Sequence, residues 1–278
     1  MNNNSNLILC DNIDFTSDQL FLSVLYIVVF CIGLPSNCMA LYGLYRLVKG
    51  EDILPVFAIN LLLSDLLQIS TLPLWIDYYM NGHKWRFGEA SCSIIGCTFF
   101  ISLFVSIFFM CCISLERYLA VTRPLWFRRH SKIRNSAVFC LVLWVFVTVC
   151  TSVAFSLGFE SSPNELCMEK YPAEKSFAVF QLFAMTISFI LPLIFFLFAY
   201  CSIRNNISGV VSIPNEEKEK ILLLLFLILV VFVVVFGPFH IICYVAYIGV
   251  LFLEDSCDYE ASIFIYFQVV HRQQNFDS

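Results

Sequence analysis

An acidic and a basic residue, Glu116 and Arg117, stand next to each other at the end of a long apolar segment. No charged residue lies between Ser91 and this pair, and an α-helix from Cys92 to Arg117 would be roughly 37 Å long. That length crosses a hydrocarbon core, which is about 30 Å thick. Arg117 could be a switch at a membrane surface, held by its neighbour in one state and released toward a partner in another. The alternative is an interfacial pair that only reaches toward the head groups.

The composition is that of a membrane protein. Of the 278 residues, 60% are hydrophobic and 13% are charged, and the mean hydropathy is +0.83. Soluble domains are about 45–50% apolar and about 25% charged. The sequence therefore predicts an all-α protein with several membrane-spanning helices. It gives no reason to expect a nucleic-acid partner, because the net charge is −5 and the basic residues are distributed among loops.

Basic residues concentrate in alternate loops, and by the positive-inside rule those loops are cytoplasmic and the amino terminus is outside. The cytoplasmic set is Arg46, Lys49, Arg117, Arg123, Arg128, Arg129, Lys132, Arg134, Arg204, Lys218 and Lys220. The first span is expected to serve as the insertion signal, without a cleaved signal peptide. We expect a multi-pass protein of the plasma membrane.

Six segments are long enough to span a bilayer, at about 19–45, 53–80, 92–121, 136–158, 177–203 and 221–251. A seventh apolar segment, 261–270, has only about ten residues where a span needs about 20. We therefore predict a seven-transmembrane-helix bundle over 19–270 with a truncated seventh helix. Residues 1–18 are predicted to be an extracellular tail with a glycosylation acceptor at Asn3, and 271–278 an atypical C-terminal tail.

Four of the 13 cysteines lie at the outer end of a span or outside the spans, all on the predicted outer side: Cys10, Cys92, Cys167 and Cys257. Disulfides persist outside the cell, and four cysteines allow three pairings. A Cys92–Cys167 bond would tie the third helix to the loop after the fourth, and we predict this bond. A Cys10–Cys257 bond would tie the amino terminus to the loop before the seventh segment. Free surface thiols are the alternative.

Asp65 is a lone carboxylate in the middle of the second span, where charge is costly and marks a functional site by default. Asn37 and Ser106 are expected at similar depths on the first and third helices. These oxygens would suit a sodium ion, and a structural hydrogen-bond hub is the alternative. No other cofactor is predicted, because nothing resembles metal-ligand spacing.

Two of the four histidines, His83 and His240, are predicted to face the outer side. Histidine titrates near neutral pH, so either could be a proton switch. For each, the alternative is a polar pocket residue that never changes charge. His83 is placed in a loop beside several carboxylates, whereas His240 would face the bundle on the sixth span. We therefore expect the larger contribution to a pH response from His83.

The ordered set of motifs resembles the rhodopsin-like G-protein-coupled receptors. It comprises Gly33-x-Pro35-x-Asn37, Leu61-Leu-Leu-Ser-Asp65, Trp85-x-Phe87-Gly88, Cys92, Glu116-Arg117-Tyr118, Trp144, Cys167, Pro192 with Tyr200, and Phe232 with Pro238. Within that family, the sequence most resembles the proton-sensing and lysolipid-linked receptors, such as the ovarian-cancer and T-cell-death-associated receptors. This closer resemblance is carried by residues 72–78, 111–114, 170–175, 238–240 and 256–259.

The resemblance implies a receptor that senses extracellular protons or a lysolipid and activates a heterotrimeric G protein. Arg117 would contact the G protein, Glu116 would restrain it, and Tyr118 and Tyr200 would belong to the same activation switch. The trigger would act in an outer pocket between the third, fifth, sixth and seventh helices. His83, His240 and Phe236 are the residues that we assign to sensing.

Three departures leave other functions open. Val235-Phe236-Gly237 stands where such receptors usually have Cys-Trp before the sixth-helix proline. On the fourth span, Val147 stands where proton-sensing receptors tend to have a buried acid. The Asn/Asp-Pro-x-x-Tyr motif that usually ends the seventh helix is absent. One alternative is a truncated isoform that does not signal, forming a receptor dimer with full-length receptors or being retained away from them. Another is a receptor for a different small ligand. An enzyme or transporter is not expected, because Asp65 has no paired carboxylate.

Overall fold

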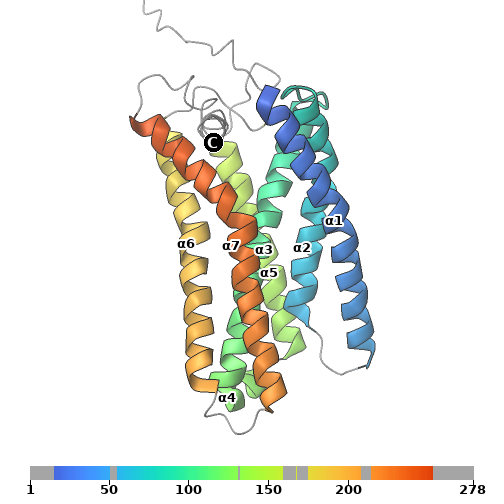
Figure 1. Ribbon diagram of the computed structural model, residues 1–278, viewed down its shortest axis with the longest axis vertical. Coiled ribbons are helices and arrows are strands. Elements are labelled where there is room, and N and C mark those ends of the chain that lie inside the picture. Colours follow the sequence, from blue (N-terminus) through green and yellow to red (C-terminus); the bar gives the residue numbers. More distant parts are fainter. Residues whose placement is uncertain are drawn as a thin grey trace, which may run out of the picture.

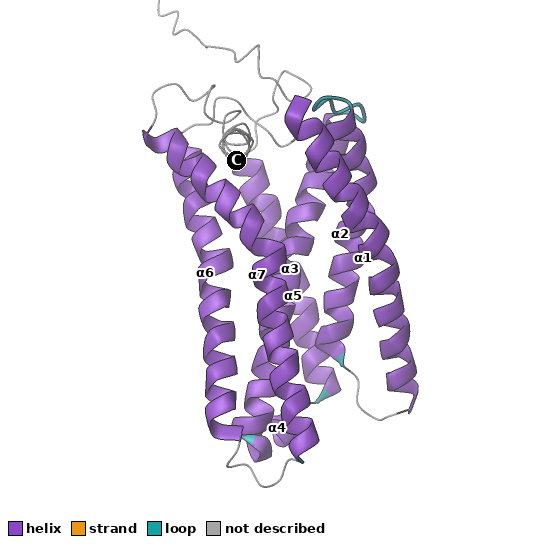
Figure 2. Cartoon of the chain, viewed as in Figure 1, coloured by secondary structure: helices purple, strands orange, loops and turns teal. Residues whose placement is uncertain are grey.

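The structure is a computed structural model that describes residues 16–50, 55–130, 132–158, 167, 175–207 and 214–252. These residues form α-helices joined by short connections, with no strand among them (Figure 1, Figure 2). The helices are α1 (Thr16–Gly50), α2 (Val56–Met80), α3 (Glu89–Thr122), α4 (Pro124–His130), α5 (Ile133–Gly158), α6 (Lys175–Asn206) and α7 (Asn215–Phe252). The predicted all-α class is confirmed.

Six of these helices, all except the short α4, are long and apolar enough to cross a membrane. They correspond in order to the six spans predicted from the sequence. The helix α4 was missed, because the run of basic residues that contains it has the composition of a solvated loop. The predicted seventh segment at 261–270 and the two terminal tails lie outside the described residues.

Helix α3 is the centre of the bundle. It packs against α2 on one side and against α5, α6 and α7 on the others. In Figure 1, α1 and α2 lie side by side at one edge of the bundle, and α6 and α7 lie at the opposite edge. The buried core follows from this arrangement, since Leu103, Ile107 and Met110 of α3 pack with Phe196 of α6 and Phe232 of α7.

Two of the sequence motifs have a direct packing role. At Gly33 of α1, a Cβ atom would lie 3.1 Å from the Ile69 side chain of α2, so glycine permits the close approach of these helices. Trp144 of α5 donates a hydrogen bond from Nε1 to the side-chain oxygen of Asn60 on α2, at 3.1 Å. This bond pairs two polar groups at membrane depth, where an unpaired polar group is costly.

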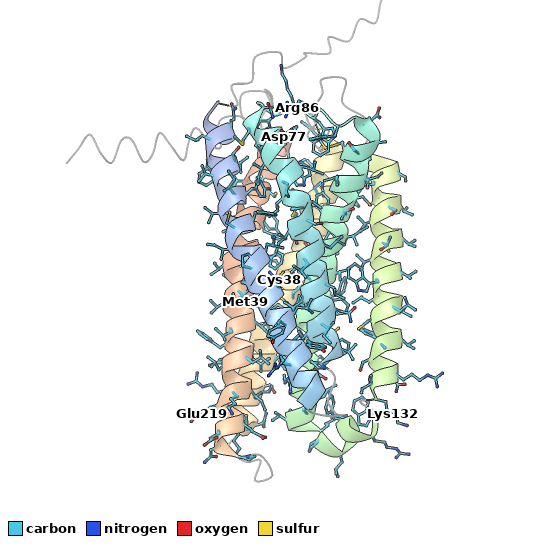
Figure 3. The ribbon with its side chains drawn as sticks, turned by 90° about the vertical axis from the view of Figure 1, so that its right-hand side faces the viewer. Cys38, Met39, Asp77, Arg86, Lys132 and Glu219 are labelled. Carbon is cyan, nitrogen blue, oxygen red and sulfur yellow. A yellow bond between two sulfur atoms is a disulfide. The ribbon has the colours of Figure 1, made fainter. Side chains whose placement is uncertain are left out.

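The polar and apolar residues are sorted as a bilayer requires. Figure 3 shows Asp77 and Arg86 at one end of the bundle and Lys132 and Glu219 at the other. Along α5, most of the exposed side chains within the span are apolar: Val138, Phe139, Leu141, Val142, Val145, Phe146, Val149 and Val153. Such a face is compatible with lipid rather than with water.

Candidate functional site

A disulfide between Cys92 and Cys167 holds one end of the bundle, which we call the disulfide end. The two Cα atoms are 5.6 Å apart. Trp75, Tyr78 and Trp85 are buried around the bond, and together with Cys167 they form the disulfide cluster. The backbone amide of Cys167 donates to the Tyr78 hydroxyl at 3.3 Å. The pairing that we predicted from the sequence is therefore present, and it is embedded in packed aromatic rings.

The Trp85-x-Phe87-Gly88 motif closes the loop between α2 and α3. Trp85 donates from Nε1 to the Gly88 carbonyl at 3.0 Å and to the Ser91 hydroxyl at 2.9 Å, and its ring centroid lies 5.7 Å from that of Trp75. Gly88 has φ +84°, a conformation that favours glycine, and it precedes the first turn of α3. The motif thus fixes where α3 begins beside the disulfide.

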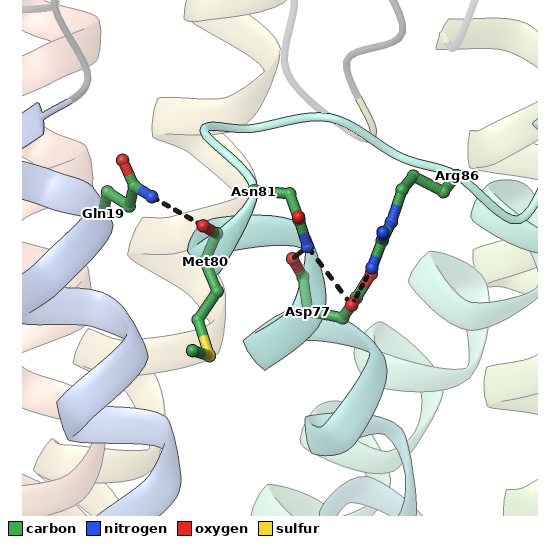
Figure 4. A network of polar contacts seen from close by, with 5 residues as sticks. All are labelled: Gln19, Asp77, Met80, Asn81 and Arg86. Carbon is green, nitrogen blue, oxygen red and sulfur yellow. Dashed lines mark hydrogen bonds and ion pairs between the residues drawn. The ribbon is translucent and has the colours of Figure 1, made fainter.

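A polar network covers the same end of the bundle (Figure 4). Arg86 forms an ion pair with Asp77 and donates from Nε to the same carboxylate at 3.2 Å. The Asn81 amide donates to the backbone oxygen of Asp77 at 2.6 Å, and Gln19 of α1 donates to the Met80 carbonyl at 2.6 Å. The carboxylate of Asp77 is therefore occupied by a cation and is not a free charge beside the loop.

His83 lies in the loop between α2 and α3, as expected, but its side chain is buried and does not face solvent. Only 3% of its surface is exposed. The backbone has positive φ at Gly82 (+67°) and His83 (+60°), and the His83 amide donates to the Tyr78 carbonyl at 3.1 Å. This turn folds the imidazole back onto α2, with ring centroids 5.3 Å from Tyr78 and 5.0 Å from Tyr79. His83 and His240 therefore do not differ in whether they are exposed to solvent.

His240 of α7 is also buried, at 1% exposure, but its polar contacts join two helices. Its Nδ1 lies 2.7 Å from the Phe236 carbonyl, which can only accept, so Nδ1 carries a proton. Its Nε2 lies 3.3 Å from the Ser188 hydroxyl of α6, and that hydroxyl also lies 3.2 Å from the Met185 carbonyl. Phe189 of α6 stacks on the imidazole, with the centroids 4.7 Å apart.

This arrangement has a hydrogen-bonding solution for either charge state of His240. A neutral ring accepts the Ser188 proton at Nε2. A protonated ring donates from Nε2 to the Ser188 oxygen, and the Ser188 hydroxyl then donates to the Met185 carbonyl. Phe236, the third residue assigned to sensing, is 6% exposed and packs on Phe232 in the core.

Two of the three residues assigned to a sodium site come together. The Ser106 hydroxyl of α3 donates to the Asp65 carboxylate at 2.7 Å and lies 2.8 Å from the Ser64 hydroxyl. Asn37 instead donates its amide to the Gly33 carbonyl of its own helix at 2.9 Å. The oxygens around Asp65 are the hard ligands that a sodium ion would take, so the donor set fits such an ion.

The opposite end of the bundle, which we call the Arg117 end, is held by apolar contacts and contains the side chain of Arg117. Tyr118 of α3 and Tyr200 of α6 pack in one cluster with Ile203 and with Leu225 of α7. The structure thus places two of the four residues of the assigned switch together.

Arg117 itself lies one residue before Tyr118 on α3. Its Nε is buried and has no hydrogen-bond partner in the described part of the chain. Within the same residues it forms no ion pair with its neighbour Glu116. The restraint assigned to Glu116 therefore stays a prediction. A buried N–H without a partner is costly, so a group that accepts from Arg117 would bind favourably.

Several residues important to these sites were not singled out from the sequence. Ser188 and Phe189 contact His240 from another helix, and no local pattern marks them. Tyr78 and Tyr79 surround His83 only because of the turn at Gly82. Three residues with predicted roles lie outside the described residues: Asn3, Cys10 and Cys257.

Comparison with known proteins identifies the fold family. The family described as 7 transmembrane receptor (rhodopsin family) matches residues 36–273. G-protein coupled receptor 68 of Homo sapiens is 29% identical over 256 residues, covering 91% of this chain and 69% of that protein. G-protein coupled receptor 65 of Homo sapiens is 31% identical over 251 residues, covering 87% and 73%. Probable G-protein coupled receptor 132 of Homo sapiens is 29% identical over 234 residues, covering 84% and 60%. The chain belongs to the rhodopsin family of seven-transmembrane receptors.

Proposed function

We propose that this receptor sits in the plasma membrane with its disulfide end outside, senses extracellular protons or a lysolipid, and activates a heterotrimeric G protein. Its relatives are named as G-protein coupled receptors, which supports the coupling. Among the triggers we favour the proton. The observation that carries this choice is the position of His240, buried between α6 and α7 with a hydrogen-bonding solution for both charge states.

A change at His240 has a continuous packing route toward the Arg117 end. Phe189 stacks on His240, and its centroid lies 5.3 Å from that of Phe232, which in turn lies 5.0 Å from Phe196. Tyr200 follows Phe196 by one turn of α6. Protonation that alters the contact between α6 and α7 would therefore also alter the packing at the Arg117 end, where Arg117 meets its partner. This route couples the two ends because His240 and Arg117 would both bias the same equilibrium between two packings of α6 and α7.

The test is second-messenger output from cells that express the chain, measured as cyclic AMP or inositol phosphate against external pH from about 6 to 8, the range where histidine titrates. His240→Phe removes both polar contacts and should abolish most of the pH dependence. His83→Phe should move the pH midpoint less, because the His83 ring lies against Tyr78 and Tyr79 and not between two spanning helices. His130→Phe, on α4 at the opposite end, is the matched control.

Each other outcome separates the alternatives. A flat curve in unmodified receptor that stains at the cell surface would discard proton sensing and leave a lysolipid or another small ligand. Retention inside the cell, with no output, would instead favour the non-signalling form that acts by pairing with full-length receptors. A steep curve unchanged by either substitution would move the trigger to outer carboxylates.

A further inference from the structure

A cavity of about 310 Å³ lies between α3, α5 and α6, and its lining includes His240, one of the residues that we assign to sensing. Its walls are mostly aromatic and aliphatic, with Phe104 and Phe108 from α3, Phe146 and Ala154 from α5, and Met185 from α6. A single residue of α7, His240, lines its inner end. This volume is at the lower limit of small-ligand pockets, which span about 300–1,000 Å³.

The cavity is reached from the side, at membrane depth. Helix α3 packs against both α5 and α6, which lie on either side of the cavity. Three lining rings remain exposed at its rim, namely Phe108 at 43%, Phe146 at 57% and Phe180 at 53%, whereas His240 at the inner end is 1% exposed. All three helices are membrane-spanning, so the molecules that meet this rim are lipids.

The shape suits one hydrocarbon chain. On α6 the lining runs from Phe180 to Ser188, a helical rise of about 12 Å. If a methylene group takes about the volume of a water molecule in the liquid, roughly 30 Å³, the cavity holds on the order of ten of them. Two chains side by side would not fit in that volume.

The polar residues of the lining determine which lipid head group the cavity can bind. Gln181 lines the cavity one turn inside the span of α6, near the disulfide end, and its amide has no hydrogen bond among the described residues. An unpaired amide at this depth favours a ligand that both donates and accepts. Among the described residues, the lining contains no Lys, Arg, Asp or Glu, so no side chain beside Gln181 carries a permanent charge that would compensate a charged head group.

We propose that this cavity binds a single-chain lipid with an uncharged, hydroxyl-bearing head group, of the monoacylglycerol class. The head group hydrogen-bonds to Gln181, and the chain extends along α6 toward Ser188 and His240. The bilayer supplies the ligand directly through the rim. The proposal does not depend on proton sensing, because the contacts with the head group are made by Gln181 alone.

The experiment uses the full chain in lipid nanodiscs and a monoacylglycerol that carries a photoreactive diazirine in its acyl chain. Cross-linked peptides are identified by mass spectrometry, with and without excess unlabelled monoacylglycerol. We expect labels at 146–155 and 180–188, and their loss on competition. Ala154→Phe fills the cavity and should lower labelling roughly tenfold, the factor that about 1.4 kcal/mol of lost binding gives. Val153→Phe is the matched control, since Val153 faces lipid outside the cavity.

A second filling variant, Ala184→Phe, protects the test against misfolding of the first, and each variant is checked for monodisperse elution. Gln181→Leu should remove the preference for monoacylglycerol over a fatty-acid methyl ester of the same chain length. Labels spread evenly over the outward faces of all helices, or insensitive to competitor, would overturn the proposal. So would equal labelling of Ala154→Phe and Val153→Phe proteins.

Discussion

The two ends of the bundle are built in opposite ways. At the disulfide end, a covalent bond, buried aromatic rings and the Asp77–Arg86 ion pair fix α2 and α3 and the loop between them. At the Arg117 end, apolar contacts join α3, α6 and α7, and the half-buried Arg117 has a buried Nε without a hydrogen-bond partner among the described residues. Apolar packing without directional bonds can slide or rearrange at small cost, whereas bonded clusters cannot. We infer that the disulfide end is the fixed frame and the Arg117 end is the part that moves.

The largest effect on stability is expected from the disulfide. Cys167→Ala should lower the free energy of unfolding by about 2–5 kcal/mol, as for other native disulfides. The measurement is thermal unfolding in detergent, and Cys38→Ala, at a free cysteine exposed on α1, is the control. Equal melting temperatures for the two variants would show that the disulfide end is not held by its covalent bond.

An intermediate effect is expected in the middle of the bundle. Ser106→Ala removes the hydroxyl that donates to Asp65 and should cost about 1–3 kcal/mol, because the carboxylate loses a charge-assisted hydrogen bond. The same substitution, and Asp65→Asn, should reduce the extra thermal stability in sodium chloride relative to choline chloride. If salt identity has no effect on the unmodified protein, the sodium site is rejected and the hydrogen-bond hub remains.

The smallest effect on stability is expected at Arg117, although its effect on function should be complete. Arg117→Leu removes a buried N–H that has no partner, so stability should change by less than about 1 kcal/mol, and toward higher values. G-protein activation should be lost while surface expression is retained. Arg123→Leu, at an exposed position just beyond α3, is the control. Strong destabilisation by Arg117→Leu would mean that the arginine is a structural anchor.

The bundle could be predicted from the sequence because hydrophobic length and charge placement determine spanning helices almost alone. For the Cys92–Cys167 bond, the predicted topology only narrowed the choice to three pairings, since it places four cysteines on the same side. The surroundings of His83 could not be predicted from the sequence, because they depend on the turn at Gly82 and on aromatic rings from α2. Ser188 and Phe189, which contact His240, come from another helix, and the sequence does not specify the rotation of that helix about its axis. The cavity also depends on that rotation.

The most direct test of the division between a fixed and a moving end is a pair of distances measured by pulsed electron spin resonance. Spin labels are attached through noncanonical amino acids, because the described residues include free cysteines. One pair replaces Lys132 and Glu219 at the Arg117 end, and the other replaces the exposed residues Met80 and Ser93 at the disulfide end. On acidification from about pH 8 to 6, the range where histidine titrates, the first distance distribution should shift and the second should stay unchanged. A shift at the disulfide end, or no shift at either end in receptor that signals in acid, would contradict this division.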